Sequence, residues 1–220
     1  FRIETAKVMT PMASWAVTQA VAISTYTARE LRKFVDVPVE VIPYTAELAP
    51  SKTTARARNG ERSILFVGRL IERKGVAHLI RALGTVRRTV PARLIIVGDG
   101  PERASLERLA AATDVASHVH FRGRVSDEEL RQAYASADVF VLPSVLDQRQ
   151  DTEGLGVVLL EAMNYGVPVV ASNIGGITDI VQHESTGLLV PPGDEGALAK
   201  ALTALLENPE LSRSLGQGGV

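Results

Sequence analysis

Short apolar runs alternate with amphipathic stretches along this chain, and the alternation limits its fold more than any other feature. The runs are rich in Val, Ile and Leu, as in strands that are buried on both faces of a sheet. Between them lie stretches with apolar residues at helical spacing, such as 76–83 and 102–109. We therefore predict an α/β fold with a doubly wound, Rossmann-like parallel sheet. The runs span residues 20–23, 39–42, 64–67, 94–97, 139–142 and 168–171.

Composition excludes several classes of partner and of site. The 24 basic and 25 acidic residues nearly cancel, so no global positive field attracts nucleic acid. No apolar run reaches the roughly 18 residues that cross a bilayer, and residues 1–24 lack a signal-peptide pattern. The chain has no cysteine, which removes thiolate metal sites and is compatible with a cytoplasmic location. Its four histidines do not cluster, so no metal site is predicted.

The apolar pattern breaks between residues 46 and 62, where turn formers replace the periodic spacing. This stretch is the predicted linker, and residues 63–220 carry enough strand and helix units for a Rossmann-like domain. Residues 1–45 contain two strands and a helix, too little for an independent core, and are interpreted as the end of another domain. Since the chain starts with Phe1 and not with Met, we expect a missing N-terminal segment.

Ligands of doubly wound sheets bind outside the carboxyl ends of the strands, so the segments that follow the runs are the candidate sites. The first segment, 68–75, contains Gly68, Arg69 and Lys74 before a predicted helix. Glycine lets the backbone approach a ligand closely, and Arg with Lys at a helix N-terminus suits a diphosphate. A solvated basic turn is the alternative interpretation of this segment.

Two further glycine turns follow predicted strands. Gly98 could face a ligand, or its turn could simply connect a strand to a helix with Asp99 as the helix cap. Arg124 and Val125 follow Gly123 and could hold a nucleobase, or the segment could be a loop without a ligand. The sequence leaves both alternatives open for each of these two turns.

The fourth segment carries the strongest signal of a site. Glu153 and Glu161, separated by seven residues, flank the start of a predicted helix that begins near Leu155. Unpaired amides in the first turn of that helix would point at phosphate oxygens beside Glu153. Glu161 would lie about two turns further in, within reach of a ribose. As alternatives, Glu153 is an acidic cap and Glu161 a solvated charge, but apolar neighbours make an unpaired carboxylate costly at Glu161.

Together these segments resemble family 4 of the retaining glycosyltransferases, which are two-domain enzymes of the GT-B fold, and the likeness is to their C-terminal, donor-binding domain. The resemblance implies transfer of a sugar from a nucleotide-diphosphate sugar, with retention and without a metal or other cofactor. It implies that Arg69 and Lys74 hold the diphosphate and that Glu153 positions the donor sugar, which makes these three the catalytic residues. The donor-binding set that it implies is Gly68, Gly98, Arg124, Val125, Gly154, Leu155, Gly156, Val157 and, on the ribose, Glu161.

The same resemblance implies that the domain 63–220 is truncated at its C-terminus, since the chain stops before the family's last helix. It also implies partners outside this sequence. In this family an N-terminal domain completes the site, so the fragment alone is expected to be inactive, and the acceptor is an unidentified sugar, lipid-linked molecule or small molecule. The expected location is cytoplasmic, with peripheral attachment to the inner face of the membrane through the missing domain as an option. The alternative functions are a nucleotide-sugar epimerase of the same two-domain fold and a non-catalytic nucleotide-sugar-binding module.

Overall fold

The computed structural model describes residues 17–44 and 60–219, and its main element is one parallel sheet. The strands of this sheet are β3 (Arg62–Val67), β4 (Ala92–Val97), β5 (Val119–Gly123), β6 (Val139–Leu142), β7 (Val169–Ser172) and β8 (Leu188–Val190). Their spatial order is β5-β4-β3-β6-β7-β8. The chain therefore builds outward from β3 to one edge, returns to β6 beside β3, and continues to the other edge. This order confirms the predicted doubly wound sheet.

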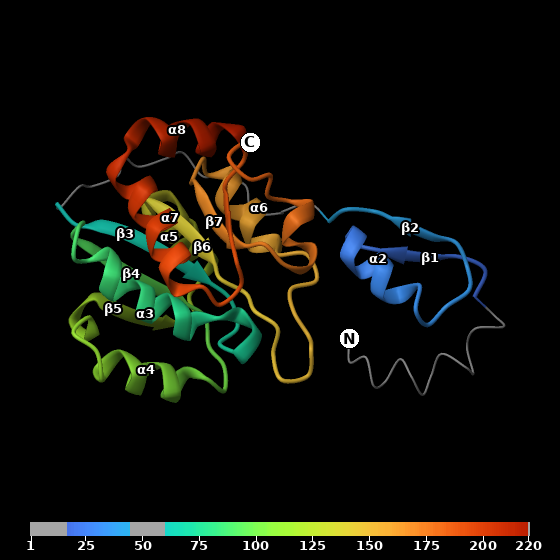
Figure 1. Ribbon diagram of the computed structural model, residues 1–220, viewed down its shortest axis with the longest axis horizontal. Helices are drawn as coiled ribbons and strands as arrows, with labels where there is room; N and C mark the ends of the chain where they lie inside the picture. Colours follow the sequence, from blue (N-terminus) through green and yellow to red (C-terminus); the bar gives the residue numbers. More distant parts are fainter. Residues whose placement is uncertain (1–16, 45–59, 220) are drawn as a thin grey trace.

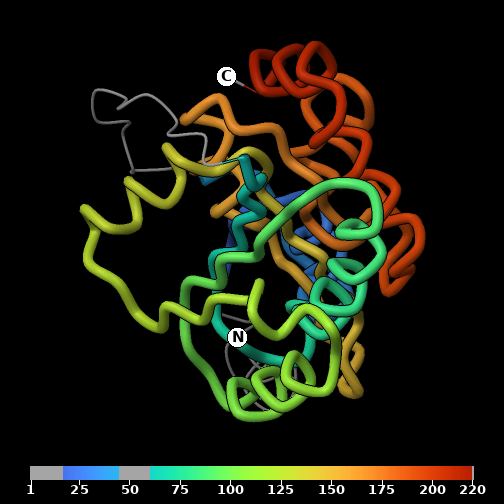
Figure 2. The backbone as a smooth tube through the Cα atoms, turned by 90° about the vertical axis from the view of Figure 1, so that its left-hand side faces the viewer, coloured from blue at the N-terminus to red at the C-terminus, as the bar shows by residue number. Residues whose placement is uncertain are grey.

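Helices cover both faces of the sheet (Figure 1). They are α3 (Val76–Val86), α4 (Arg103–Ala111), α5 (Asp127–Ser136), α6 (Val157–Asn164), α7 (Glu195–Glu207) and α8 (Pro209–Gly218), with the 3₁₀ turns η1 (Glu72–Lys74), η2 (Ala116–His118) and η3 (Gly175–Asp179). α3 packs against α4 and α7, and α6 packs against β6 and β7. Figure 2 shows α5 and α7 on opposite sides of the strands. The crossover connections of a parallel sheet require this arrangement.

The centre of the sheet forms the core. β3 is fully buried from Ile64 to Phe66, and β6 is fully buried over its whole length. The apolar composition of these strands predicts this burial, since a central strand with helices on both faces has no side toward solvent. Each fully buried Ile, Leu or Phe side chain contributes about 1.5–3 kcal/mol to stability. β3 and β6 are therefore rigid anchors for the loops that follow them.

A smaller unit precedes the main sheet along the chain. It consists of β1 (Ala20–Ala22), α2 (Thr25–Leu31) and β2 (Val39–Val41), with the two strands paired in parallel. Figure 1 shows this unit, in blue, beside the part that contains β7 and α6. Most of the predicted linker 46–62 lies outside the described residues.

Hydrogen bonds connect the start of α2 to the main part of the structure. Ser24 caps α2, and its hydroxyl also donates to the carbonyl oxygen of Gly154 at 2.6 Å. The amide of Thr25 donates to the Asp179 carboxylate, and the Thr25 hydroxyl donates to the same carboxylate at 2.6 Å. Both contacts reach residues that follow strands of the main sheet. The start of α2 is therefore held against the carboxyl edge of that sheet.

The structure shifts one expected helix start by two residues and excludes one alternative that the sequence left open. α6 begins at Val157, two residues after Leu155, because Gly156, with φ 91°, takes a left-handed conformation at the N-cap. Glu161 therefore lies about one turn inside α6, and not two. The cap of α4 is Glu102 and not Asp99, whose carboxylate accepts a hydrogen bond from the next amide in the chain at 2.7 Å.

Candidate functional site

The candidate site lies at the carboxyl ends of β3 and β6, where the chain leaves adjacent strands in opposite directions. Such a switch point is where doubly wound sheets bind ligands. Lys74 of η1 and Glu153, from the loop after β6, form an ion pair here through Nζ and Oε2. The two side chains are only 12% and 11% exposed. The predicted convergence of the basic loop with Glu153 is thus present for Lys74.

Arg69 belongs to the same loop but is placed differently. Its side chain is exposed, and it forms no ion pair with any residue that the structure describes. Leu70, the next residue, is fully buried and anchors the loop. Arg69 is therefore positioned at the edge of the sheet with its guanidinium uncommitted, while Lys74 is already engaged. Their roles as a diphosphate-holding pair stay predictions.

Arg73 also contacts the loop of Glu153, which was not predicted from the sequence. Its Nη1 atom donates to the carbonyl oxygen of Thr152 at 3.3 Å and lies 3.9 Å from Oε2 of Glu153. Its Nε atom lies 4.0 Å from the Asp151 carboxylate. Arg73 and Lys74 therefore hold the Glu153 loop together. Adjacent side chains on a 3₁₀ turn point in different directions, so no pattern in the sequence indicates that both would reach this loop.

Gly75 fixes the position of the basic loop over β6. Its φ of 66° lies in the left-handed region, where it ends η1 and begins α3. A Cβ atom on Gly75 would lie 2.9 Å from the carbonyl carbon of Pro143, and closer still to the oxygen. Only glycine combines this φ with this close approach. The contact places Lys74 directly above the end of β6, where Glu153 arrives.

The N-terminus of α6 opens beside the ion pair. The N-cap Gly156 supplies no side-chain hydrogen bond, and the first turn contains no acidic residue. The amides of Leu155, Gly156 and Val157 donate to no acceptor within the described part of the chain. Free amides at the positive end of a helix favour an anion such as phosphate. Lys74 and these amides therefore both favour an anionic ligand.

The loop that carries Glu153 is supported from behind by η3. The Gly176 amide donates to the Glu153 carbonyl oxygen at 2.9 Å. A Cβ atom on Gly176 would lie 2.6 Å from the carbonyl carbon of Gly154, so the two backbones touch directly. With Ser24 bonded to the same Gly154 carbonyl, the loop has supports on two sides. Glu153 is therefore held by backbone contacts as well as by Lys74.

Glu161 occupies the next turn of α6 and is half-buried. Its Oε2 atom accepts a hydrogen bond of 2.6 Å from the hydroxyl of Tyr134, a fully buried residue of α5. Burial, and then the nearby Glu161 carboxylate, raise the pKa of Tyr134 well above its usual range. Tyr134 thus remains a hydrogen-bond donor to Glu161 at any ordinary pH. The predicted contact of Glu161 with a ribose stays a prediction.

The turns after β4 and β5 continue the same edge of the sheet. A Cβ atom on Gly98 would lie 2.9 Å from the carbonyl carbon of Gly68, and the Gly98 amide donates to the Gly123 carbonyl at 2.7 Å. Gly98 therefore serves packing between the turns, and its amide is not free for a ligand. Arg124 is exposed and without an ion pair in the described part of the chain, while Val125 packs against the core.

The loop 145–151 extends the site beyond the sheet. Its Asp147 carboxylate accepts hydrogen bonds from the amides of Arg149 and Asp151, both at 2.9 Å, and the Val145 amide donates to the Arg73 carbonyl at 2.9 Å. The loop is thus organised by its own aspartate. Beside it lies an open hollow of about 560 Å³, lined by apolar residues that include Val145, Leu146, Ile174 and Pro192.

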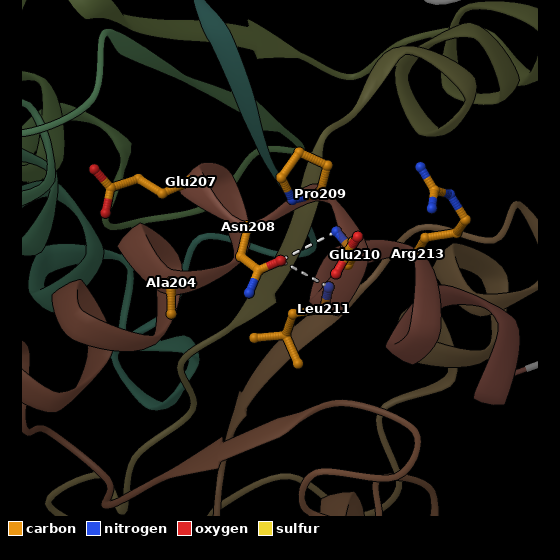
Figure 3. Close-up of a pocket in the computed structure, with 7 residues that line it drawn as sticks. All are labelled: Ala204, Glu207, Asn208, Pro209, Glu210, Leu211 and Arg213. Atoms are coloured by element: carbon orange, nitrogen blue, oxygen red, sulfur yellow. Dashed lines mark hydrogen bonds between the residues drawn. The ribbon is translucent and has the colours of Figure 1, made fainter.

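Two other hollows lie away from this site. One sits between α7 and α8, where Asn208 caps α8 by accepting from the amides of Glu210 and Leu211 (Figure 3). The second is lined by Arg62 and Asp138, at the amino ends of β3 and β6. Both therefore lie at the edge of the sheet opposite the ion pair. Within the described ranges, no cluster of three acidic or histidine side chains could hold a metal, and no helix is long and apolar enough to cross a membrane.

The family described as "Glycosyl transferases group 1" matches residues 51–219. A GDP-mannose-dependent alpha-(1-6)-phosphatidylinositol monomannoside mannosyltransferase of Mycobacterium tuberculosis is 41% identical over 174 residues, which cover 78% of this chain and 45% of that protein. An alpha-D-kanosaminyltransferase of Streptomyces kanamyceticus is 31% identical over 232 residues, which cover 96% of this chain and 58% of that protein. The chain spans about half the length of these relatives.

Solved structures share the arrangement of the elements. Sucrose-phosphate synthase from Thermosynechococcus elongatus matches 99% of this chain and 56% of its own, with a TM-score of 0.84 and 32% identity. Anabaena Alr3699/HepE in complex with UDP and glucose matches 100% of this chain and 61% of its own, with a TM-score of 0.86 and 22% identity. The second likeness concerns the fold alone, given its low identity.

Proposed function

The chain belongs to the group 1 glycosyltransferases, and on that premise we propose that it carries the donor-binding side of an enzyme that transfers a sugar from a nucleotide-diphosphate sugar. The observation that supports this most directly is the Lys74–Glu153 ion pair at the start of α6, beside the amides of Leu155, Gly156 and Val157, which have no acceptor among the described residues. A cation, helix amides and a carboxylate then surround one small volume. A diphosphate linked to a sugar offers complementary groups to all three. No relative named above is an epimerase, and the family assignment favours transfer.

Each candidate residue has a chemical task in this proposal. The Lys74 ammonium and the exposed Arg69 guanidinium balance the charge that develops on the leaving diphosphate, a task that requires no metal. The amides of Leu155, Gly156 and Val157 bind phosphate oxygens. The donor set also includes Gly68, Gly154, Glu161, Arg124 and Val125, with the last two beside the base.

The transfer step itself uses few protein groups. With retention, the acceptor hydroxyl attacks the anomeric carbon on the face from which the diphosphate leaves. The bond from that carbon to the diphosphate oxygen breaks, and the leaving oxygen takes the acceptor proton. Glu153 accepts hydrogen bonds from sugar hydroxyls and forms no bond to the anomeric carbon. Lys74 stabilises the departing charge, so its removal should lower the rate of transfer more than it weakens donor binding.

In the protein without a donor, the Lys74 side chain already lies where the diphosphate is proposed to bind. Its ammonium pairs with Glu153, which keeps it at the switch point and avoids an unpaired charge in a nearly buried place. A diphosphate with two or three negative charges would attract Lys74 more strongly than one carboxylate does. On binding, Glu153 would then gain freedom to meet the sugar hydroxyls. The fragment alone, without a second domain across the site, is proposed to bind donor but not to transfer it.

Calorimetry with UDP and with GDP tests the proposal. We expect weak binding of a nucleoside diphosphate that is unchanged by EDTA. Lys74→Met should weaken it by tenfold or more, on the order of a lost charged hydrogen bond. Lys200→Met is the matched control, since Lys200 of α7 is exposed and far along the chain from the site. No binding of any nucleoside diphosphate at millimolar concentration, by protein that is folded, would refute the proposal, and dependence on a metal would refute its metal-free form.

The acceptor and the location are proposed only as classes. One relative is named for a phosphatidylinositol monomannoside acceptor, so a lipid-linked acceptor is one class to assay. Sugars and small molecules are the others. Attachment to the inner face of the membrane would then come through another part of the protein. A full-length enzyme that transfers nothing to any of these classes would favour a non-catalytic binding module.

A further inference from the structure

Glu161 is a carboxylate without a cation. Within the described part of the chain it forms no ion pair, and its hydrogen bond comes from the hydroxyl of Tyr134 at 2.6 Å. The tyrosine belongs to α5 and the glutamate to α6, 27 residues later. A half-buried carboxylate without a cation is costly unless hydrogen bonds stabilise it. Tyr134 supplies that stabilisation while adding no charge.

The ring of Tyr134 is fixed by its neighbours. It is fully buried, it stacks on Tyr165 with centroids 5.6 Å apart at 23°, and it lies 5.8 Å from Phe140 at 41°. Tyr165 follows Glu161 by four residues, so both lie on the same side of α6. The aromatic contacts and the hydroxyl contact therefore act on one face of one helix. The direction in which the hydroxyl points is set by packing.

Glu161 lies about one turn from the N-terminus of α6. Side chains of a helix lean toward its N-terminus, so we expect the carboxylate to extend toward the amides of Leu155, Gly156 and Val157. Tyr134 takes Oε2 and leaves Oε1 without a partner in the described part of the chain. An Arg or Lys in place of the tyrosine would compete with a ligand for both oxygens. The single neutral hydroxyl of Tyr134 occupies one lone pair of the Glu161 carboxylate and leaves the other lone pairs for a ligand.

We propose that Tyr134 is a positioning residue that orients the Glu161 carboxylate to accept a hydrogen bond from a ribose hydroxyl of the donor nucleotide. This inference rests on the proposed function, since it requires a nucleotide at the mouth of α6. To distinguish ribose from deoxyribose, the carboxylate must be held in one orientation. The buried Tyr134 fixes the orientation of the carboxylate, and Glu161 itself accepts the hydrogen bond from the ribose.

The competing explanation is that Tyr134 is only a core residue whose hydroxyl found a nearby acceptor. Buried tyrosines generally do find one. The two explanations differ in what the hydroxyl controls. A structural role changes stability and every nucleotide affinity alike, whereas a positioning role changes affinity only for nucleotides that carry the ribose hydroxyl.

The test is binding of a nucleoside diphosphate and its 2′-deoxy and 3′-deoxy forms by the wild-type chain and by Tyr134→Phe. We expect the wild type to prefer the ribonucleotide over at least one deoxy form by about tenfold, as for a hydrogen bond to a charged group. Tyr134→Phe should lose most of that preference, with ribonucleotide affinity falling about tenfold. Affinity for the discriminated deoxy form should change less than about twofold. Phe140→Leu, which disturbs the same cluster, is the packing control and should keep the preference.

A second variant keeps the test decisive if Tyr134→Phe loses stability. Ribose preference in Glu161→Gln and in the double variant with Tyr134→Phe should be equally low, because the tyrosine acts only through the glutamate. Preserved ribose preference in a folded Tyr134→Phe chain would overturn this inference and leave the proposed function intact. A wild-type chain that binds no nucleotide would instead refute the proposed function.

Discussion

Replacement of Gly75 by alanine should destabilise the protein strongly, and the structure gives the size of the effect. The left-handed φ of 66° costs a residue with a Cβ atom about 1–2 kcal/mol. The new Cβ atom would also overlap the Pro143 carbonyl group, and overpacking of this type adds about 1–3 kcal/mol. We therefore expect a loss of about 3 kcal/mol in the free energy of unfolding. For a chain of this size that lowers Tm by about 6–12 °C.

Substitutions of two other glycines distinguish the cost of the left-handed backbone from the cost of the overlap with Pro143. Gly166 has a similar φ of 63° but no atom within 4 Å of a Cβ position, so Gly166→Ala should cost only about 1–2 kcal/mol. Gly84 lies within α3 with equally open space, and Gly84→Ala should stabilise the helix by about 0.5–1 kcal/mol. Calorimetric melting of the three variants gives the comparison. If Gly75→Ala melts with or above Gly166→Ala, the predicted overlap with Pro143 is absent and the reasoning fails.

Three further predictions follow from contacts around the site. Lys74→Met and Glu153→Gln should each cost about 2 kcal/mol in urea unfolding, and the double variant less than their sum; additive costs would contradict a direct pair. Asp179→Ala removes both hydrogen bonds from the start of α2 and should speed amide exchange there, while exchange in α4 stays constant. Hydrogen bonds from the Ser126 backbone and then its side chain lower the pKa of Glu129, so their stabilisation is present at pH 7 and lost as pH falls through that lowered pKa. Ser126→Ala should therefore lower the urea midpoint more at pH 7 than at about pH 3, and an equal loss at both values would count against it.

The sheet and the main convergence could be predicted because both depend on short-range patterns. The apolar runs at 64–67 and 139–142 predict central strands, and they prove to be neighbours. The segments that follow neighbouring parallel strands leave the sheet at the same edge. Lys74 and Glu153 therefore came together as expected. Arg69, in the same loop, did not join them, since the sequence does not tell which side of a loop faces inward.

The contacts that were missed depend on direction or on distance along the chain. Tyr134 sits at helical spacing among apolar residues, so it reads as core, and its reach to Glu161 depends on how α5 and α6 pack. The start of α6 depends on a left-handed φ at Gly156. Any glycine can adopt such a φ, so the sequence does not show that this one does. The contact of Ser24 with Gly154 joins residues 130 apart, and no local pattern encodes it.

The direct backbone contacts between neighbouring turns limit how this edge of the sheet can change. Gly98 fits against Gly68, and Gly176 against Gly154, with no side chain between them. An insertion in one such turn would collide with the other, so we expect related proteins to alter these turns only in pairs. The loop 145–151 is different, because Asp147 holds it from within. A loop that is held by its own hydrogen bonds can be exchanged without change to the neighbouring turns, so we expect replacement of residues 145–151 to leave the rest of this edge intact.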